Sequence, residues 1–115
     1  MSVQRIKPGP RMSQAVTHGN TVYLAGLTAD DPALDVKGQT AQILAKIDAL
    51  LAEAGTDKSR LLTANIWLTD IGTWSQMNEV WDAWVSPGNA PARATVEAKL
   101  AAPSWKVEIM VQAAR

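Results

Sequence analysis

The segment from Ala90 to Leu100 holds the side chain best suited to bind an anion. Its sequence is APARATVEAKL, and Arg93 follows Pro91 and Ala92 at the start of a predicted strand. The ends of elements on a rigid scaffold are common places for functional groups. A guanidinium is planar, forked and always charged, which suits bidentate binding of a carboxylate. Arg93 is therefore a candidate ligand for the carboxylate of a small substrate.

Glu108 is the candidate for proton transfer. It lies in the run WKVEIMV, where Val107, Ile109 and Val111 alternate with other residues. If these three apolar side chains face the core, Glu108 faces the other side of the sheet. A carboxylate that reaches a water molecule can act as a general acid or base. The pattern alone favours a simpler interpretation, in which Glu108 is an exposed strand residue paired with a lysine.

The other side chains that often carry out chemistry are scarce. The single histidine, His18, lies in a turn signal with Gly19 and Asn20, where it is expected to be solvated. The sequence has no cysteine, which excludes thiol nucleophiles and thiolate metal sites. Without a second histidine or a cysteine, we expect no metal site. No serine lies in a recognisable pattern with a histidine base.

The composition predicts one small globular domain over residues 1–115. Apolar residues make up 47% of the chain, and 11 basic and 11 acidic residues give a formal net charge of zero. Nucleic acid is a weak candidate partner because no basic excess is concentrated anywhere along the chain. We expect no membrane partner and a cytoplasmic location, because no run is long enough to span a bilayer and the first residues lack a signal-peptide pattern.

The N-terminal third predicts an irregular arm followed by a hairpin. Residues 1–12 hold two prolines and a glycine, which are typical of irregular structure. The runs Ser13–His18 and Thr21–Ala25 flank a turn and predict a β-hairpin. Gly26 closes the second strand, and its lack of a side chain lets another group approach the backbone closely.

Two helices follow from the change to a helical period. The first is predicted over Val36–Ala54, with Asp35 as N-cap and Gly55 at the C-terminal end. The second is predicted from Thr73 or Trp74 to about Val85.

Three more strands complete an α+β fold, predicted over Leu61–Leu68, Ala94–Leu100 and Lys106–Gln112. A mixed sheet with two helices packed on one face leaves its other face to be covered. Alternating apolar residues in the last two strands therefore favour oligomerisation through the open face.

Five tryptophans and no phenylalanine make the aromatic content unusual. Four of the tryptophans are interpreted as core or helix packing, namely Trp67, Trp74, Trp81 and Trp84. Trp105 is the better candidate to border the site because it lies near Glu108 in the sequence.

Six segments follow one another in a specific order and spacing: Ser13–Val16, Val22–Gly26, Gln39–Gly55, Met77-Asn78 with Trp81, Pro91–Glu97 and Lys106–Ile109. In this order the sequence resembles the reactive-intermediate deaminases, also called the endoribonuclease L-PSP or YjgF/YER057c/UK114 family. The resemblance covers nearly the whole chain. It implies a chorismate-mutase-like α+β fold and a homotrimer, with a barrel-like core of three sheets and sites between the subunits.

The resemblance also implies roles for particular residues. Arg93 would hold the substrate carboxylate, and Glu108 would orient water and move protons at the imine carbon. Gly26 and Asn78 would shape the pocket. The implied ligand is a small imino or enamine acid, or the keto acid formed from it. Catalysis in this family needs no metal or organic cofactor.

Three candidate substrate-binding positions depart from the usual pattern of the family. Met12 stands where many members have tyrosine, Ala25 where many have serine, and Thr95 where many have cysteine. Loss of the tyrosine and serine hydroxyls predicts a more apolar pocket, with an altered substrate preference or a lower activity.

These observations lead to three hypotheses. The first is a deaminase that hydrolyses reactive 2-imino or 2-enamine acids to 2-keto acids and ammonia. The alternative is a non-catalytic trimer that binds small carboxylates as a sensor or chaperone-like module. A ribonuclease, suggested by one of the family names, is disfavoured by the zero net charge and the single histidine.

Overall fold

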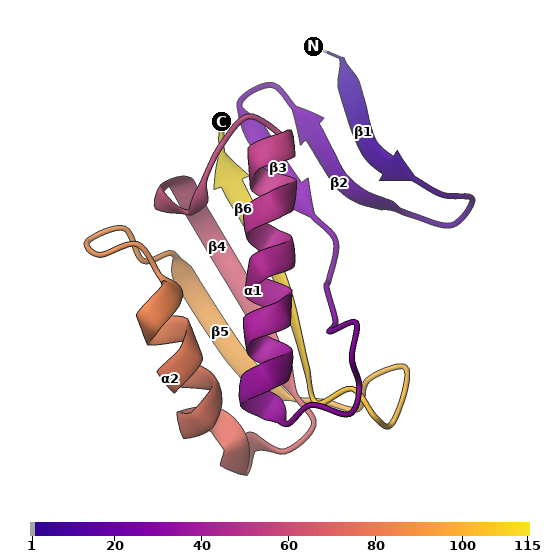
Figure 1. The fold of residues 1–115 in the computed structure, drawn as a ribbon. Helices are drawn as coiled ribbons and strands as arrows, with labels where there is room; N and C mark the ends of the chain where they lie inside the picture. Colours follow the sequence, from indigo (N-terminus) through magenta and orange to yellow (C-terminus); the bar gives the residue numbers. More distant parts are fainter. Residues whose placement is uncertain (1) are drawn as a thin grey trace.

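The computed structural model describes residues 2–115, which form one six-stranded sheet covered on one face by two helices (Figure 1). The strands are β1 (Val3–Pro8), β2 (Ser13–His18), β3 (Thr21–Leu24), β4 (Leu61–Leu68), β5 (Ala92–Glu97) and β6 (Val107–Ala114). They lie in the order β1-β2-β3-β6-β4-β5. Only the β4–β5 pair is parallel among the described residues, so the sheet is mixed, as predicted.

The helices are α1 (Val36–Glu53) and α2 (Trp74–Trp84), and short 3-10 turns, η1 (Lys58–Arg60) and η2 (Ile71–Thr73), precede β4 and α2. The Oδ1 atom of Asp35 accepts a hydrogen bond of 2.9 Å from the amide of Gly38, which confirms the predicted N-cap. Gly55 follows the C-cap with a φ of 83°, a conformation that favours glycine. No helix within residues 2–115 is both long and apolar enough to cross a membrane.

The prediction of an irregular N-terminal arm was wrong, because Val3–Pro8 forms β1 and pairs with β2. All but one of its side chains are exposed, so the sequence shows no alternation between buried and solvated positions. Pro8 ends this edge strand, where the missing amide proton costs the ladder little.

The strand that carries Arg93 begins two residues earlier than predicted. β5 runs parallel to β4 from the pair Thr63–Ala92 to the pair Leu68–Glu97. Arg93 therefore lies inside the ladder opposite Ala64, and its orientation is fixed by the pairing with β4. The last strand is also shifted, to Val107–Ala114.

The two faces of the sheet differ in what covers them. Val107, Ile109 and Val111 are buried in the core beneath the helices, as the alternation around Glu108 predicted. The expectation that the alternating apolar residues of the last strand contribute to the open face was therefore wrong, and of the two last strands only β5 offers such a residue there, Val96. The other face remains open, and its side chains include Tyr23 and Val96, which are 41% and 49% exposed. This open face carries more exposed apolar surface than a solvated sheet requires.

Candidate functional site

β5 directs Arg93 to the helix-covered face of the sheet. Its partner in β4, Ala64, is buried on that face. The guanidinium carbon lies 5.3 Å from the ring centroid of Trp81, a buried residue of α2. This cation–π contact supports the side chain from one side and leaves its other side free to meet a ligand.

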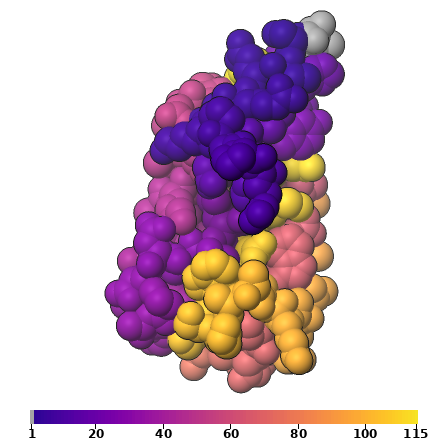
Figure 2. Space-filling model, turned by 90° about the vertical axis from the view of Figure 1, so that its right-hand side faces the viewer, coloured from indigo at the N-terminus to yellow at the C-terminus, as the bar shows by residue number. Residues whose placement is uncertain are grey.

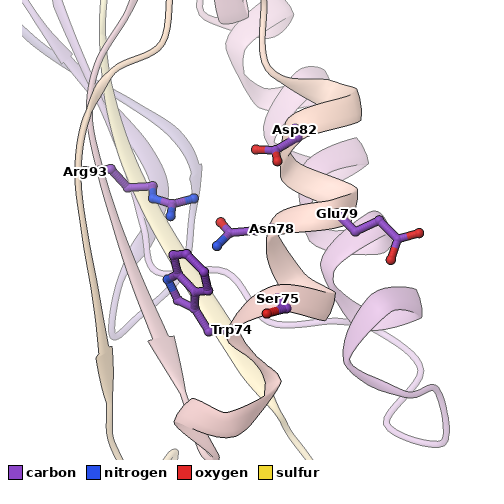
Figure 3. A pocket seen from close by; sticks show the side chains of 6 residues that line it. All are labelled: Trp74, Ser75, Asn78, Glu79, Asp82 and Arg93. Carbon is purple, nitrogen blue, oxygen red and sulfur yellow. The ribbon is translucent and has the colours of Figure 1, made fainter.

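Arg93 opens into a cavity of about 580 Å³, here called the arginine pocket (Figure 3). It is lined by Trp74, Ser75, Asn78, Glu79, Asp82 and Arg93. In Figure 3 the guanidinium points from β5 toward Asn78 on α2, whereas the carboxylate of Glu79 points away. Glu79 forms an ion pair of 2.7 Å with Lys37, so it does not neutralise the guanidinium.

Burial lowers the pKa of Arg93 from its ordinary value, and the nearby carboxylate of Asp82 opposes this shift. An arginine remains protonated at neutral pH even with such a shift. The pocket therefore presents a partly desolvated cation, which attracts an anion more strongly than a solvated one does.

Two buried polar atoms beside Arg93 have no hydrogen-bond partner within residues 2–115. They are Oδ1 of Asn78 and Oγ1 of Thr95. Thr95 follows Arg93 by two residues in β5, so both side chains lie on the same face. An unpaired buried polar atom costs about 1–3 kcal/mol, and such atoms often mark places where a ligand or partner supplies the missing bond.

Trp74 does not pack in the core, so that part of the tryptophan interpretation was wrong. It is 49% exposed at the start of α2 and forms a wall of the arginine pocket. Trp81 and Trp84 do pack together, with ring centroids 5.3 Å apart. The sequence did not distinguish the exposed Trp74 from the buried Trp81, because both have the same residue type on one helix.

Glu108 lies on the open face, and its carboxylate folds over the backbone of Gly26. A Cβ atom at Gly26 would collide with Oε2 of Glu108. The expectation that this glycine admits a close approach is thus confirmed, and the approaching group is the candidate catalytic carboxylate. Two backbone hydrogen bonds between Leu27 and Ile109, of 2.8 and 3.1 Å, hold this segment against β6.

The carboxylate borders a second cavity of about 300 Å³, here called the glutamate pocket. It is lined by Met12, Gln14, Gly26, Leu27, Thr28, Lys46, Trp105 and Glu108. Met12 comes from the turn of the β1–β2 pair, here called the N-terminal hairpin, and Trp105 from the segment before β6. Figure 2 shows these parts on the same side of the molecule, with the indigo hairpin above the yellow and orange segment. The expectation that Trp105 lies close to Glu108 is confirmed.

Glu108 is not paired with a lysine, so the simpler interpretation of this residue was wrong. Its neighbour Lys106 donates from Nζ to the carbonyl of Leu34 at 3.2 Å. No hydrogen bond or ion pair reaches the Glu108 side chain within residues 2–115. Partial burial raises the pKa of this carboxyl above its ordinary value. A raised pKa makes the carboxylate a stronger base toward water than an ordinary glutamate.

A buried amide fixes the segment that carries Trp105. The Nε2 atom of Gln39 donates to the carbonyls of Pro32, Leu34 and Ser104, and its Oε1 atom accepts from the amide of Lys106. Gln39 is fully buried in α1. The sequence pointed to Gln39 only as part of a helix, because a buried glutamine and a surface one look alike in a periodic pattern.

The structure places the predicted site residues in two groups on opposite faces of the sheet. Arg93 and Asn78 line the arginine pocket, with Thr95 beside them. Met12, Gly26 and Glu108 line the glutamate pocket.

Ala25 lines neither pocket. It packs against the core, and its amide donates to the carbonyl of Gln14 at 2.9 Å. Sequence reasoning missed Trp74 and Asp82 in one pocket and Lys46 in the other. For Lys46, the sequence indicated only that it lies on the polar face of the predicted first helix. In the described part of the chain, no group of three or more His, Asp or Glu side chains could hold a metal.

Comparisons with known proteins show which proteins this chain resembles over its length. A family model described as Endoribonuclease L-PSP matches residues 2–115. A RutC family protein of Haemophilus influenzae is 47% identical over 115 residues, which cover 96% of this chain and 97% of the relative. The RutC family protein YoaB of Escherichia coli is 46% identical over 114 residues, or 99% of each chain.

Solved structures share the fold. A member of the YjgF protein family from Neisseria meningitidis has a TM-score of 0.97 and 44% sequence identity. The match covers 100% of this chain and 96% of that one. The two helices on a mixed sheet of six strands are therefore the architecture of a known group of proteins.

Proposed function

Because the chain belongs to the Endoribonuclease L-PSP family, with RutC and YjgF proteins among its relatives, we propose that it hydrolyses 2-imino or 2-enamine acids to 2-keto acids and ammonia. One observation carries this proposal. Glu108 is a partly buried carboxylate that no described residue pairs with. It packs against the backbone of Gly26 and lines a pocket large enough for a small acid. A surface glutamate with only a structural role would gain nothing from this desolvation.

The complete site requires two chains. Arg93 and Glu108 lie on opposite faces of one sheet, so a small substrate cannot touch both within one subunit. A neighbouring copy whose arginine pocket faces the glutamate pocket would bring the two residues together. The exposed apolar side chains of the open face, such as Tyr23 and Val96, support an assembly through that face, and we propose a homotrimer.

In this site Arg93 binds the substrate carboxylate and sets the position of the imine carbon. A bidentate contact of this kind contributes about 1.5–3 kcal/mol, and it also orients a small substrate for attack. Asn78 lines the same pocket, and Thr95 lies on the same face of β5 as Arg93. The unpaired Oδ1 of Asn78 and Oγ1 of Thr95 would gain partners if side-chain movement on binding brought them to the polar atoms of the substrate.

Glu108 acts on water. Its carboxylate takes a proton from a water molecule as the oxygen attacks C2 of the imine, and the C=N double bond becomes a single bond. The nitrogen takes up this proton, which gives the carbinolamine. Glu108 then moves the proton of the new hydroxyl group to the nitrogen as the C–N bond breaks, so that ammonia leaves and C2 becomes the carbonyl of the keto acid. An enamine first takes a proton at C3, which converts it to the imine. General acid–base help of this kind gives roughly 10²–10⁴-fold acceleration.

A non-catalytic carboxylate-binding trimer is the second candidate. Met12 lines the glutamate pocket with a thioether and brings no hydroxyl to hold a water molecule. If the absence of this hydroxyl group abolishes catalysis, Arg93 still binds small carboxylates, and the protein acts as a sensor or chaperone-like partner.

The deciding experiment is a coupled hydrolysis assay. An amino-acid oxidase generates 2-iminopropionate, semicarbazide traps the imine that remains, and the protein competes by hydrolysing it. We expect the wild-type protein to suppress semicarbazone formation and Arg93→Ala to lower this activity by about 10- to 100-fold, the loss of one charge-assisted contact.

Arg5→Ala serves as the matched control, because it removes the same charge from an exposed position on β1. It should keep full activity. An Arg93→Ala protein as active as the wild type would refute the deaminase proposal. If the wild-type protein is inactive on several imino acids, binding of 2-ketobutyrate that depends on Arg93 would favour the second candidate.

A further inference from the structure

A third cavity adjoins the glutamate pocket. It has a volume of about 360 Å³ and is here called the lysine pocket. It lies between the N-terminal hairpin and α1 and is lined by Lys7, Gln14, Lys46, Ala49 and Leu50. Gln14 and Lys46 line the glutamate pocket as well, so the two cavities are neighbours on either side of these side chains.

The lysine pocket is lined by two basic side chains and by no acidic one. Lys7 and Lys46 are its only ionisable lining residues. The Nζ atom of Lys46 donates to the carbonyl of Thr28 at 2.8 Å and to Asp30 at 3.0 Å, and Asp30 is 79% exposed on its outer side. These bonds fix the ammonium group between the two cavities, and its third N–H is left for another acceptor.

The backbone at Lys7 supplies an independent observation. Its φ is 48°, and no other non-glycine residue within residues 2–115 has a positive φ. The β1–β2 ladder pairs Ile6 with Ala15 and then Pro8 with Ser13 in an unchanged register, so Lys7 lies opposite Gln14 without a bulge. A positive φ at a non-glycine residue is uncommon, and such conformations cluster at functional sites. Lys7 and Gln14 both line the cavity that Lys46 enters.

We propose that the lysine pocket binds the distal carboxylate of a dicarboxylic imino acid whose imine carbon lies at Glu108. This inference rests on the function proposed above and names its substrate class. Arg93 of a second copy would hold the carboxylate next to the imine. Lys46 and Lys7 would hold the carboxylate at the end of a short side chain that passes Gln14. Met12 suits such a chain, since its thioether contacts methylene groups and demands no hydrogen bond.

The test compares two imines of nearly the same shape and different charge. The imine derived from glutamate carries the second carboxylate, and the imine derived from glutamine carries an amide at the same place. We expect the wild-type protein to have a higher kcat/KM for the glutamate imine. Lys7→Gln should lower that value by about two- to fivefold, as expected for an exposed ion pair, and leave the glutamine imine unchanged. The double variant with Lys7→Gln and Lys46→Gln should no longer prefer the glutamate imine over the glutamine imine.

Arg5→Gln is the matched control, because it removes the same charge from the same strand and should leave both values unchanged. Equal hydrolysis of the two imines by the wild-type protein would overturn the inference. So would an equal loss on both imines in Lys7→Gln.

A binding measurement separates this inference from the proposed function. If neither imine is hydrolysed, the deaminase proposal fails, and calorimetry with 2-oxoglutarate and 2-oxobutyrate decides the rest. Tighter binding of 2-oxoglutarate that is lost in Lys7→Gln would uphold the lysine pocket as a carboxylate site. Equal affinity for the two keto acids would overturn it.

Discussion

At the scale of single residues, the environment of Glu108 determines its protonation. Partial burial disfavours the charged carboxylate and raises its pKa, while no described cation compensates. The carboxylate is needed to take a proton from water. Activity that depends on it should therefore be lost, as the pH falls, at a higher pH than an ordinary glutamate would give.

The pH profile of kcat/KM measures this effect. We expect an acidic limb above pH ~4.5, the usual range of glutamate, and we expect Glu108→Gln to be inactive at every pH. Glu108→Asp should keep some activity with a shifted limb. A wild-type profile that stays flat down to the ordinary range would contradict the assignment of Glu108 as the base.

The same shift predicts a change in stability. The folded state binds the proton of Glu108 more tightly than the unfolded state does, so the free energy of unfolding decreases as the pH rises through these two pKa values. Glu108→Gln cannot ionise and should remove this decrease. Urea unfolding of both proteins across the acid range would show it as a smaller loss of stability in the variant.

The sequence predicted the face of Glu108 correctly, because Val107 and Ile109 flank it with an alternation that survives in the fold. It did not predict that Arg93 lies on the other face. That fact depends on the pairing of Arg93 with Ala64 and on the contact with Trp81, both of which join distant parts of the chain. No local pattern around Arg93 carries this information.

At the scale of elements, Gln39 connects α1 to the segment that precedes β6. Replacing it by leucine keeps the volume but leaves the amide of Lys106 and the carbonyl of Ser104 without their partners. We expect Gln39→Leu to lower the free energy of unfolding by about 2–4 kcal/mol, as measured by urea unfolding. It should also lower activity, because Trp105 is no longer held in place.

Gln42→Leu is the control for this prediction. Gln42 lies on the same helix and accepts only one hydrogen bond, of 3.0 Å from the amide of Asp31. We expect Gln42→Leu to lower the free energy of unfolding by less than about 1 kcal/mol. Equal effects of the two substitutions would mean that the buried amide contributes nothing specific.

The contrast between α1 and β1 shows which elements a sequence reveals. The helix buries one side and carries its own cap at Asp35, so the period and the ends were both visible. β1 buries almost nothing and is held by backbone pairing with β2. Its side chains therefore had little reason to alternate.

At the scale of the whole molecule, the open face of the sheet should be the place of self-association. Val96→Asp puts a charge on this face beside the half-buried Trp67. Because an unpaired charge is costly to bury, we expect the assembly to dissociate. Light scattering should show the mass falling from about three times to about once the 12.3 kDa of one chain. Imine hydrolysis should be lost with it.

Ala41→Asp adds the same charge on the exposed side of α1 and should leave the mass unchanged. A folded Val96→Asp protein that keeps the wild-type mass and activity would place the contact between copies elsewhere.

The placement of Arg93 and Glu108 on opposite sides of one sheet also has a genetic consequence. A chain that lacks the arginine still offers its glutamate to a neighbour, and a chain that lacks the glutamate still offers its arginine. Two defective alleles, Arg93→Ala and Glu108→Gln, should therefore complement each other when both are expressed in one cell. In randomly mixed cyclic trimers, about a quarter of the interfaces would join an intact arginine to an intact glutamate. Alleles that damage either of these two residues would then form two classes. Two alleles of the same class would not complement each other, whereas two alleles of different classes would restore activity.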